Sequence, residues 1–255
     1  MRRSVWLIFC AVVVSCADDA APGPAAERAV PSAQQVSSTA IDSAPVTTIE
    51  PAADVPTPPA TATPPTTVPV FTSAIADVNA ARLTHSWRPG CPVPLRDLRL
   101  LSVTHWGFDD RPHQGELVVH ARHADAIVSV LAQLFEVRFP IERMELVDVY
   151  EGNDDRSMVA NNTSAFNCRE VAGRPGVLSQ HALGTAIDIN PLINPWVHAG
   201  RVDPPEGAKY ADRNTAWKGA IYAEDVVVRA FASIGWGWGG YWPGSYDYQH
   251  FAANG

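Results

Sequence analysis

The sequence predicts an α+β domain over residues 80–255, with helices segregated from a small, mainly antiparallel sheet. Two observations support this fold class. Apolar side chains recur at helical spacing within residues 122–139 and again within 212–234. Shorter runs at residues 98–103 and 117–119 are rich in Val and Leu, as in β-strands. The domain also carries nearly all the aromatic residues of the chain, which a packed core of this size requires.

The first predicted helix places Ile127, Val130, Leu131 and Leu134 on one face, and the sequence Phe-Pro at 139–140 ends it. Residues 145–150 are predicted to form the next strand. A polar loop is expected from residue 151 to residue 164. The second helix is predicted to bury Val226, Val227, Ala230 and Phe231.

Residues 1–16 have the pattern of a secretion signal, with two arginines followed by an apolar run at 5–14 that is too short to span a bilayer. The run ends in Val-Val-Ser-Cys, which resembles a bacterial lipobox with Cys16 as the lipidated residue. We therefore expect an exported lipoprotein, anchored in the membrane through Cys16 and facing the cell wall. The alternative is an ordinary signal peptide, cut near Ala17 or Ala20.

Residues 17–79 are predicted to be a disordered tether. They are rich in Ala, Pro, Thr, Ser and Val and nearly lack aromatic residues, so they cannot bury enough apolar surface to offset the entropy of ordering. At about 3 Å per residue, a fully extended tether of this length would reach well over ~100 Å from a membrane. Such a reach would place the domain within a cell wall.

The net charge of -8, without any basic stripe, argues against nucleic acid as a partner. We expect a monomer. Of four cysteines, Cys10 lies in the signal and Cys16 is the proposed lipid site, which leaves Cys91 and Cys168. In an exported protein the simplest interpretation is one disulfide between these two, and two unpaired thiols are the alternative.

Two short stretches carry the candidate chemistry. In the first, His181 precedes Asp188 by seven positions, and Asp188 lies within the alternating stretch 185–189, which reads as a short strand. Gly184 supplies the backbone freedom that lets the His181 loop fold back over this strand. In the second, Asp247 precedes His250 by three positions. Two imidazoles and a carboxylate, with a spare carboxylate, are typical of a catalytic zinc site that keeps one position for water.

These residues resemble the D-alanyl-D-alanine carboxypeptidase family of zinc peptidases, which shares its fold with hedgehog signalling domains. The resemblance covers about residues 92–252. The segments 161–169, 235–240 and 247–251 also resemble the branch of the family that contains cell-wall endopeptidases and carboxypeptidases. The family pattern Ser-x-His-x-x-Gly-x-Ala-x-Asp is matched by Ser179, His181, Gly184, Ala186 and Asp188.

The resemblance implies one zinc ion per chain, held by His181, Asp188 and His250, and hydrolysis of a peptide bond in the peptidoglycan stem. Asp247 would be the general base that activates water and then protonates the leaving amine. Arg156 would orient the substrate and stabilise the oxyanion, although its sequence context differs from that of the family.

Ser179 would donate to the substrate, or would only cap the local turn. The resemblance leaves two activities open, D,D-carboxypeptidase and L-alanyl-D-glutamate-type endopeptidase. Many carboxypeptidases of the family have glutamate at the position of Asp247, whereas aspartate is found among its L-alanyl-D-glutamate endopeptidases.

A competing interpretation is a non-catalytic zinc-containing module that binds the cell wall or a partner. A solute-binding lipoprotein would need two lobes, for which this domain is too small. Among the other candidates, His120 and His123 are interpreted as exposed helix residues, and His113 as a residue that could border the cleft. Trp236 and Trp238 are expected in the core, with a peptide-lining wall as the alternative.

Overall fold

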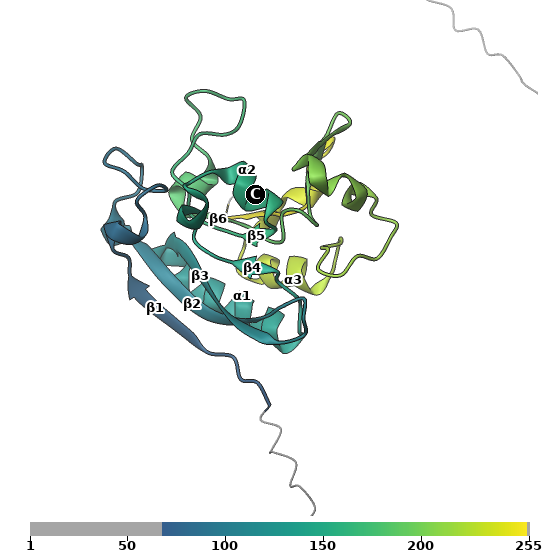
Figure 1. Cartoon of the computed structure of the whole chain (residues 1–255), viewed down its shortest axis with the longest axis horizontal. Helices are drawn as coiled ribbons and strands as arrows, with labels where there is room; N and C mark the ends of the chain where they lie inside the picture. Colours follow the sequence, from purple (N-terminus) through teal and green to yellow (C-terminus); the bar gives the residue numbers. More distant parts are fainter. Residues whose placement is uncertain (1–67, 254–255) are drawn as a thin grey trace, which may run out of the picture. The chain divides into compact units, whose positions relative to one another are not determined.

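The computed structural model describes residues 68–253, and they form an α+β domain with small, mainly antiparallel sheets (Figure 1). The predicted α+β class is therefore correct. Among these residues, no helix has both the length and the apolar content needed to cross a membrane. The predicted signal segment, the lipidation site Cys16 and residues 17–67 of the predicted tether lie outside the described residues.

The strands are β1 (Ser73–Asp77), β2 (Leu98–Trp106), β3 (Pro112–His120), β4 (Arg143–Met144), β5 (Asn162–Thr163), β6 (Ala186–Asp188), β7 (Trp196–His198), β8 (Arg201–Asp203), β9 (Gly237–Trp238), β10 (Ser245–Asp247) and β11 (His250–Ala252). The α-helices are α1 (Ala124–Glu136), α2 (Asp154–Val159) and α3 (Val226–Ser233). The 3₁₀ helices are η1 (Ala80–Arg82), η2 (Leu95–Asp97), η3 (Ala121–His123), η4 (Val147–Tyr150), η5 (Gln180–Leu183), η6 (Pro205–Ala211) and η7 (Gly239–Tyr241).

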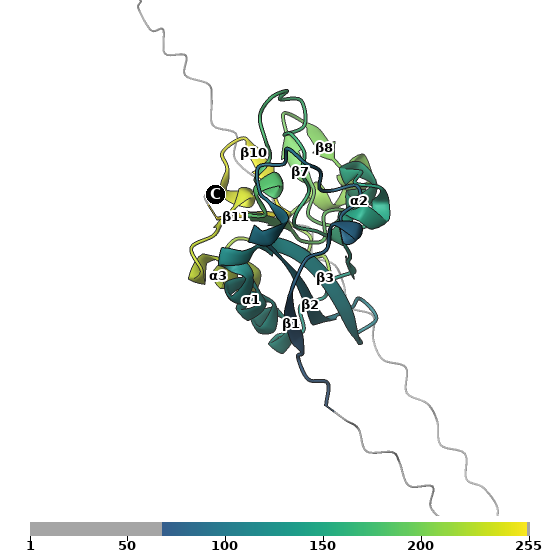
Figure 2. The same cartoon turned by 90° about the vertical axis from the view of Figure 1, so that its left-hand side faces the viewer.

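The largest sheet has the order β1-β2-β3, and both of its pairings are antiparallel. Two further antiparallel sheets, β6-β11-β9 and β10-β7-β8, are built mostly from the C-terminal half of the chain. The short parallel pair β4-β5 joins the segment after α1 to the segment before the metal motif. Figure 2 shows β7, β8 and β10 gathered at the end of the domain opposite β1.

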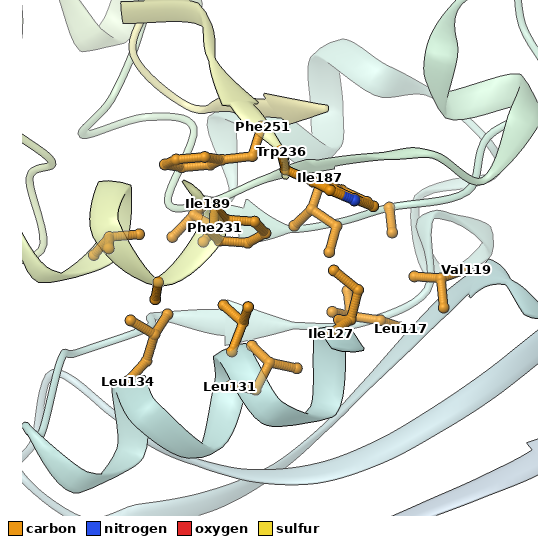
Figure 3. Packing of buried hydrophobic residues seen from close by; sticks show 14 of the residues in the cluster. Leu117, Val119, Ile127, Leu131, Leu134, Ile187, Ile189, Phe231, Trp236 and Phe251 are labelled. Atoms are coloured by element: carbon orange, nitrogen blue, oxygen red, sulfur yellow. The ribbon is translucent and has the colours of Figure 1, made fainter. Parts of the chain in front are cut away.

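One hydrophobic core joins these layers. Helix α1 turns Ile127, Leu131 and Leu134 toward it, as the 3.6-residue period predicts. Leu117 and Val119 come from β3, Ile187 from β6, Phe231 from α3 and Phe251 from β11 (Figure 3). The rings of Phe231 and Phe251 stack at 4.1 Å between centroids. Because Phe251 lies one residue after His250, this packing fixes the strand that carries a predicted ligand.

Two of the predicted elements are wrong. Residues 147–150 form the 3₁₀ helix η4 where a strand was predicted, because Asp148 accepts hydrogen bonds from Ser86 and the His85 backbone and is thus held by tertiary contacts. The predicted loop at 151–164 contains α2, which Asn153 caps by accepting a hydrogen bond from the backbone of Arg156. The second predicted helical stretch is α3, which lies within residues 212–234 and begins where Asp225 caps it.

The domain also begins earlier than residue 80. Strand β1 lies in the part of the chain predicted to be tether, and it pairs with β2 along its whole length. Every residue of β1 is exposed, so the strand has no apolar alternation that could have revealed it. Backbone pairing to a strand that follows later in the chain explains its formation.

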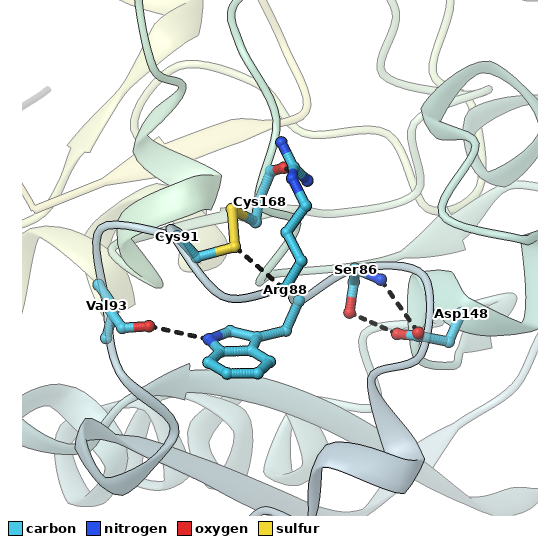
Figure 4. The surroundings of a disulfide bond; sticks show 7 residues. Ser86, Arg88, Cys91, Val93, Asp148 and Cys168 are labelled. Atoms are coloured by element: carbon cyan, nitrogen blue, oxygen red, sulfur yellow. Dashed lines mark hydrogen bonds between the residues drawn. A yellow bond between two sulfur atoms is a disulfide. The ribbon is translucent and has the colours of Figure 1, made fainter.

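A disulfide links Cys91 to Cys168, across a sequence separation of 77 residues (Figure 4). Around it, Arg88 donates a hydrogen bond to the carbonyl of Cys168 at 2.9 Å. The backbone N–H of Cys168 donates to the carbonyl of Ser86, also at 2.9 Å. The segment before β2 is thus tied to the chain that leads into the metal motif.

Candidate metal centre

Asp188 and His250 face each other across two paired strands. Strands β6 and β11 are antiparallel, and their register places His250 directly opposite Asp188. Residues opposite one another in such a pair point to the same face, and His250 Nδ1 lies 2.9 Å from Asp188 Oδ1. Both side chains are nearly completely buried. The pairing of two short strands therefore places a carboxylate and an imidazole, distant in sequence, side by side.

His181 reaches the same point from η5. Ser179 caps this helix by accepting a hydrogen bond from the backbone of His181 at 3.2 Å, which corresponds to the turn-capping alternative for Ser179. Gly184 ends the helix with φ of 65°, a conformation that favours glycine. A Cβ there would lie 2.7 Å from the backbone nitrogen of His120, so the close approach of β3 also requires glycine.

The three side chains fit a metal ion. His181 Nε2 lies 3.1 Å from Asp188 Oδ2 and 3.3 Å from His250 Nδ1. Tetrahedral zinc with bonds of about 2.0–2.1 Å would separate neighbouring ligand atoms by roughly 3.3 Å. On its other side, His181 Nδ1 donates to the carbonyl of Ala165 at 2.6 Å, which leaves Nε2 as the acceptor that a metal needs. The set is therefore preorganised as a nitrogen and oxygen donor site.

The ionisable side chains of the triad favour each other's charged forms. Burial by itself would lower the pKa of His181, but the charge and hydrogen bond of Asp188 outweigh burial and raise it. Burial would raise the pKa of Asp188, but His181 and His250 outweigh burial and hold it well below its usual range. Asp188 is therefore a carboxylate at neutral pH, which is the state that binds a cation.

Asp247 lies beside the triad at the end of β10, and one of its carboxylate oxygens is an orphan. Oδ1 is buried and has no hydrogen-bond partner among the described residues. Burial raises the pKa of Asp247 to about 7, and the nearby carboxylate of Asp188 adds to this while His250 opposes it. A Cβ at Gly239 would lie 2.7 Å from the Asp247 carbonyl oxygen, so the glycine-rich turn lets the chain pass close to Asp247. A buried carboxyl without a partner is a poor structural element and a suitable acid or base.

The sequence interpretation overlooked Arg169. Its Nη2 lies 2.6 Å from Asp154 Oδ2, with both side chains about three-quarters buried, and its Nε is buried without a partner. The charge of Arg169 opposes protonation of both His181 and Asp247, so this guanidinium is within electrostatic reach of the centre. A signal for it was present in the sequence, because Arg169 ends the segment 161–169 that resembles the family.

Arg156, the predicted substrate-orienting residue, has a different environment. It lies on α2 with 63% of its side chain exposed, and its Nη1 is 2.7 Å from Glu151 Oε2. No contact within residues 68–253 joins it to the triad or to Asp247.

The other predicted candidates lie apart from the triad. His113 pairs with Asp109 at 2.9 Å in the β2–β3 hairpin. His120 caps η3, and the side chain of Arg122 donates to that of His123. Within the described part of the chain, no third metal-ligating side chain lies with these two histidines. Trp236 and Trp238 are 3% and 5% exposed and belong to the core, as the sequence predicted.

Residues 172–253 match the family model described as D-alanyl-D-alanine carboxypeptidase. The predicted family resemblance is confirmed. The carboxypeptidase-like segment contains His181, Asp188, Asp247 and His250, and thus the whole candidate centre. It leaves out Arg156 and Arg169, and for residues 92–171 the resemblance stays a prediction. No curated protein and no solved structure matches the chain.

Proposed function

We propose that this protein is a zinc metallopeptidase that hydrolyses a peptide bond of the peptidoglycan stem. One observation carries the proposal: a buried His181, Asp188 and His250 triad lies beside the unpartnered carboxyl of Asp247, inside the segment that matches a peptidase family. Zinc, when bound, lowers the pKa of water and polarises a carbonyl oxygen. A hedgehog-like arrangement of the domain belongs to the same proposal.

The residues of the chain have separate roles in this reaction. His181 through Nε2, His250 through Nδ1 and the carboxylate of Asp188 would hold the metal, and the Ala165 carbonyl fixes the ring of His181. Asp247 takes the proton of the attacking water and passes it to the leaving amine. Its pKa of about 7 suits a group that must both accept and donate a proton near neutral pH.

Arg169 is the better candidate for orienting the scissile carbonyl. The Asp154 carboxylate holds its Nη2, so the guanidinium is fixed, and its buried Nε has no hydrogen-bond partner within residues 68–253. Fixed donors stabilise a developing oxyanion most effectively, because they need not reorganise during the reaction. Arg156 keeps its predicted role only if it leaves Glu151.

The reaction is tested with the full chain and purified muropeptides, with products identified by mass spectrometry. We expect hydrolysis of a stem peptide bond and about one bound zinc per chain. His181→Ala should abolish both. A wild-type protein that binds zinc and hydrolyses no stem peptide would instead support the non-catalytic binding module.

The proposed location follows from the N-terminal sequence. Lipidation of Cys16 would anchor the protein on the outer side of the membrane, and the Pro- and Ala-rich segment would carry the domain toward the cell wall. Cys16→Ser should release the protein into the soluble fraction. Unchanged membrane association of this variant would contradict the lipid anchor.

A further inference from the structure

The proposed base and the metal ligand that follows it belong to two different sheets. Asp247 ends β10, which pairs with β7, whereas His250 begins β11, which pairs with β6 and β9. Tyr248 and Gln249 form the connection between the two strands. Strand register within one sheet therefore does not set the position of Asp247 relative to the triad. That position depends on how the two connecting residues are held.

The chain also passes between the same two sheets in segment 189–195, which connects β6 to β7. Asn194 fixes this segment, because its side-chain amide donates to the carbonyls of Ile189 and Gly219, at 3.0 Å each. The backbone N–H of Ile189 donates to the carbonyl of Gln249, also at 3.0 Å. The two connections between the sheets are therefore in direct contact.

Arg213 contacts both connections. Its Nη1 donates to the carbonyl of Ile193 at 3.1 Å, and its Nη2 donates to Oδ1 of Asn194 at 3.0 Å. The guanidinium carbon lies over the ring of Tyr248, 4.3 Å from the ring centroid. It also lies over the ring of Tyr222, at 4.9 Å. Arg213 thus binds segment 189–195 through hydrogen bonds and the connection after Asp247 through a cation–π interaction.

Arg213 makes these contacts without a carboxylate partner. Its other hydrogen bonds go to the carbonyls of Tyr210 and Ile221, so all its hydrogen-bond acceptors within residues 68–253 are neutral oxygens. Burial lowers the pKa of Arg213, but a guanidinium stays charged at neutral pH. Removing a charge from water costs free energy and adds little net stability. The contacts of Arg213 are therefore better explained by the geometry that they impose.

We infer that Arg213 is a positioning residue, which sets the place of Asp247 relative to the metal triad by holding Tyr248 against segment 189–195. The inference rests on the proposed function, in which Asp247 must meet both the attacking water and the leaving amine. Proton transfer requires heavy atoms within about 2.6–3.2 Å of each other. A displacement of ~1 Å can cost on the order of 10²-fold in rate. A loosened Tyr248 would therefore slow the reaction, while the triad would still bind zinc.

The experiment compares the two tyrosines that contact Arg213. In assays of the zinc-loaded full chain on muropeptides, Tyr248→Leu should lower kcat by roughly 10- to 100-fold, with little change in KM or zinc content. Tyr222→Leu is the matched control, because Tyr222 contacts the same guanidinium and its hydroxyl also bonds to Trp217 and Thr215. It should lower the melting temperature at least as much and kcat much less. Equal losses of kcat in the two variants would overturn the inference.

A second measurement does not depend on activity. Arg213→Met removes the charge and the donors of this side chain. In hydrogen-exchange mass spectrometry, the backbone amides of segments 189–195 and 246–250 should then exchange about tenfold faster, while those of β2 and β3 stay unchanged. Unchanged exchange in both segments would overturn the inference.

Tyr248→Phe separates the ring face from the hydroxyl. It keeps the face that lies under the guanidinium and should retain the kcat of the wild type. A loss as large as that of Tyr248→Leu would overturn the inference, since the cation–π contact would then be irrelevant. Absence of hydrolysis by the wild type would refute the proposed function and, with it, the role of Asp247 on which the inference rests.

Discussion

Replacing Asp247 by Asn should stop catalysis and, at the same time, stabilise the metal-free protein. The substitution keeps the shape of the side chain and removes its charge and its ability to exchange a proton. General acid–base groups contribute about 10²–10⁴-fold to rates, and Asp247 would serve both proton transfers, so we expect a loss near the upper end of this range. Zinc content should stay near that of the wild type, because the triad does not include Asp247.

The effect on stability follows from the raised pKa. In the folded protein the pKa of Asp247 is about 7, compared with 3.8 for an ordinary aspartate. Between pH 3.8 and about pH 7, Asp247 is protonated in the folded state and ionised in the unfolded state. The free energy of unfolding therefore falls as the pH rises through this range, and the whole loss is present above about pH 7. The difference corresponds to roughly 4 kcal/mol. Since water reaches part of the side chain, we expect about 1–2 kcal/mol in practice.

The assay is thermal unfolding of the zinc-free wild type and Asp247→Asn at pH 5 and pH 8. We expect the variant to unfold a few degrees above the wild type at pH 8, and the difference to shrink at pH 5. Added zinc should also reduce it, because a nearby cation favours the carboxylate. Asp247→Glu is the control that keeps the charge and should retain some activity. A metal-free variant less stable than the wild type at pH 8 would refute the reasoning, since Asp247 would then make stabilising contacts.

Three further predictions concern the rest of the domain. A chain that starts at residue 80 lacks β1 and should therefore unfold at a lower temperature than a chain that starts at residue 68. Equal melting temperatures would mean that β1 does not contribute to the stability of the domain. In kinetic assays on muropeptides, Arg169→Ala should lower kcat/KM by about 10- to 100-fold through loss of an oxyanion donor. Arg156→Ala should change kcat/KM little, because Arg156 is exposed. A larger loss for Arg156→Ala than for Arg169→Ala would instead support Arg156 as the residue that orients the substrate. Cys91→Ser should cost about 2–4 kcal/mol in denaturant unfolding, since it opens a long loop.

Some features of the core and of the candidate site could be predicted because they depend on residues close together in the sequence. The helical period placed Ile127, Leu131 and Leu134 in the core. The alternation before Asp188 predicted a strand that holds this residue, and Gly184 marked the turn that lets His181 fold back. The motif spacing therefore predicted the buried cluster of His181, Asp188 and His250, which could hold a metal ion and lies within the segment that matches the family model.

Other features depended on contacts between distant segments, which a local pattern does not contain. Strand β1 is exposed throughout and exists only because β2 pairs with it. Segment 147–150 became η4 because Asp148 is bound by residues near 86.

The surroundings of the two arginines were decided in the same way. Asp154 holds Arg169 near the centre, while Glu151 holds Arg156 at the surface. The sequence by itself determined the α+β class and the grouping of His181, Asp188 and His250, since these follow from periodicity and short motifs, while the role of Asp247 as the base stays a prediction from the family resemblance. Only the tertiary structure decided which carboxylate each arginine pairs with and how strands β6 and β11 bring Asp188 next to His250, because both depend on pairing between residues far apart in the chain.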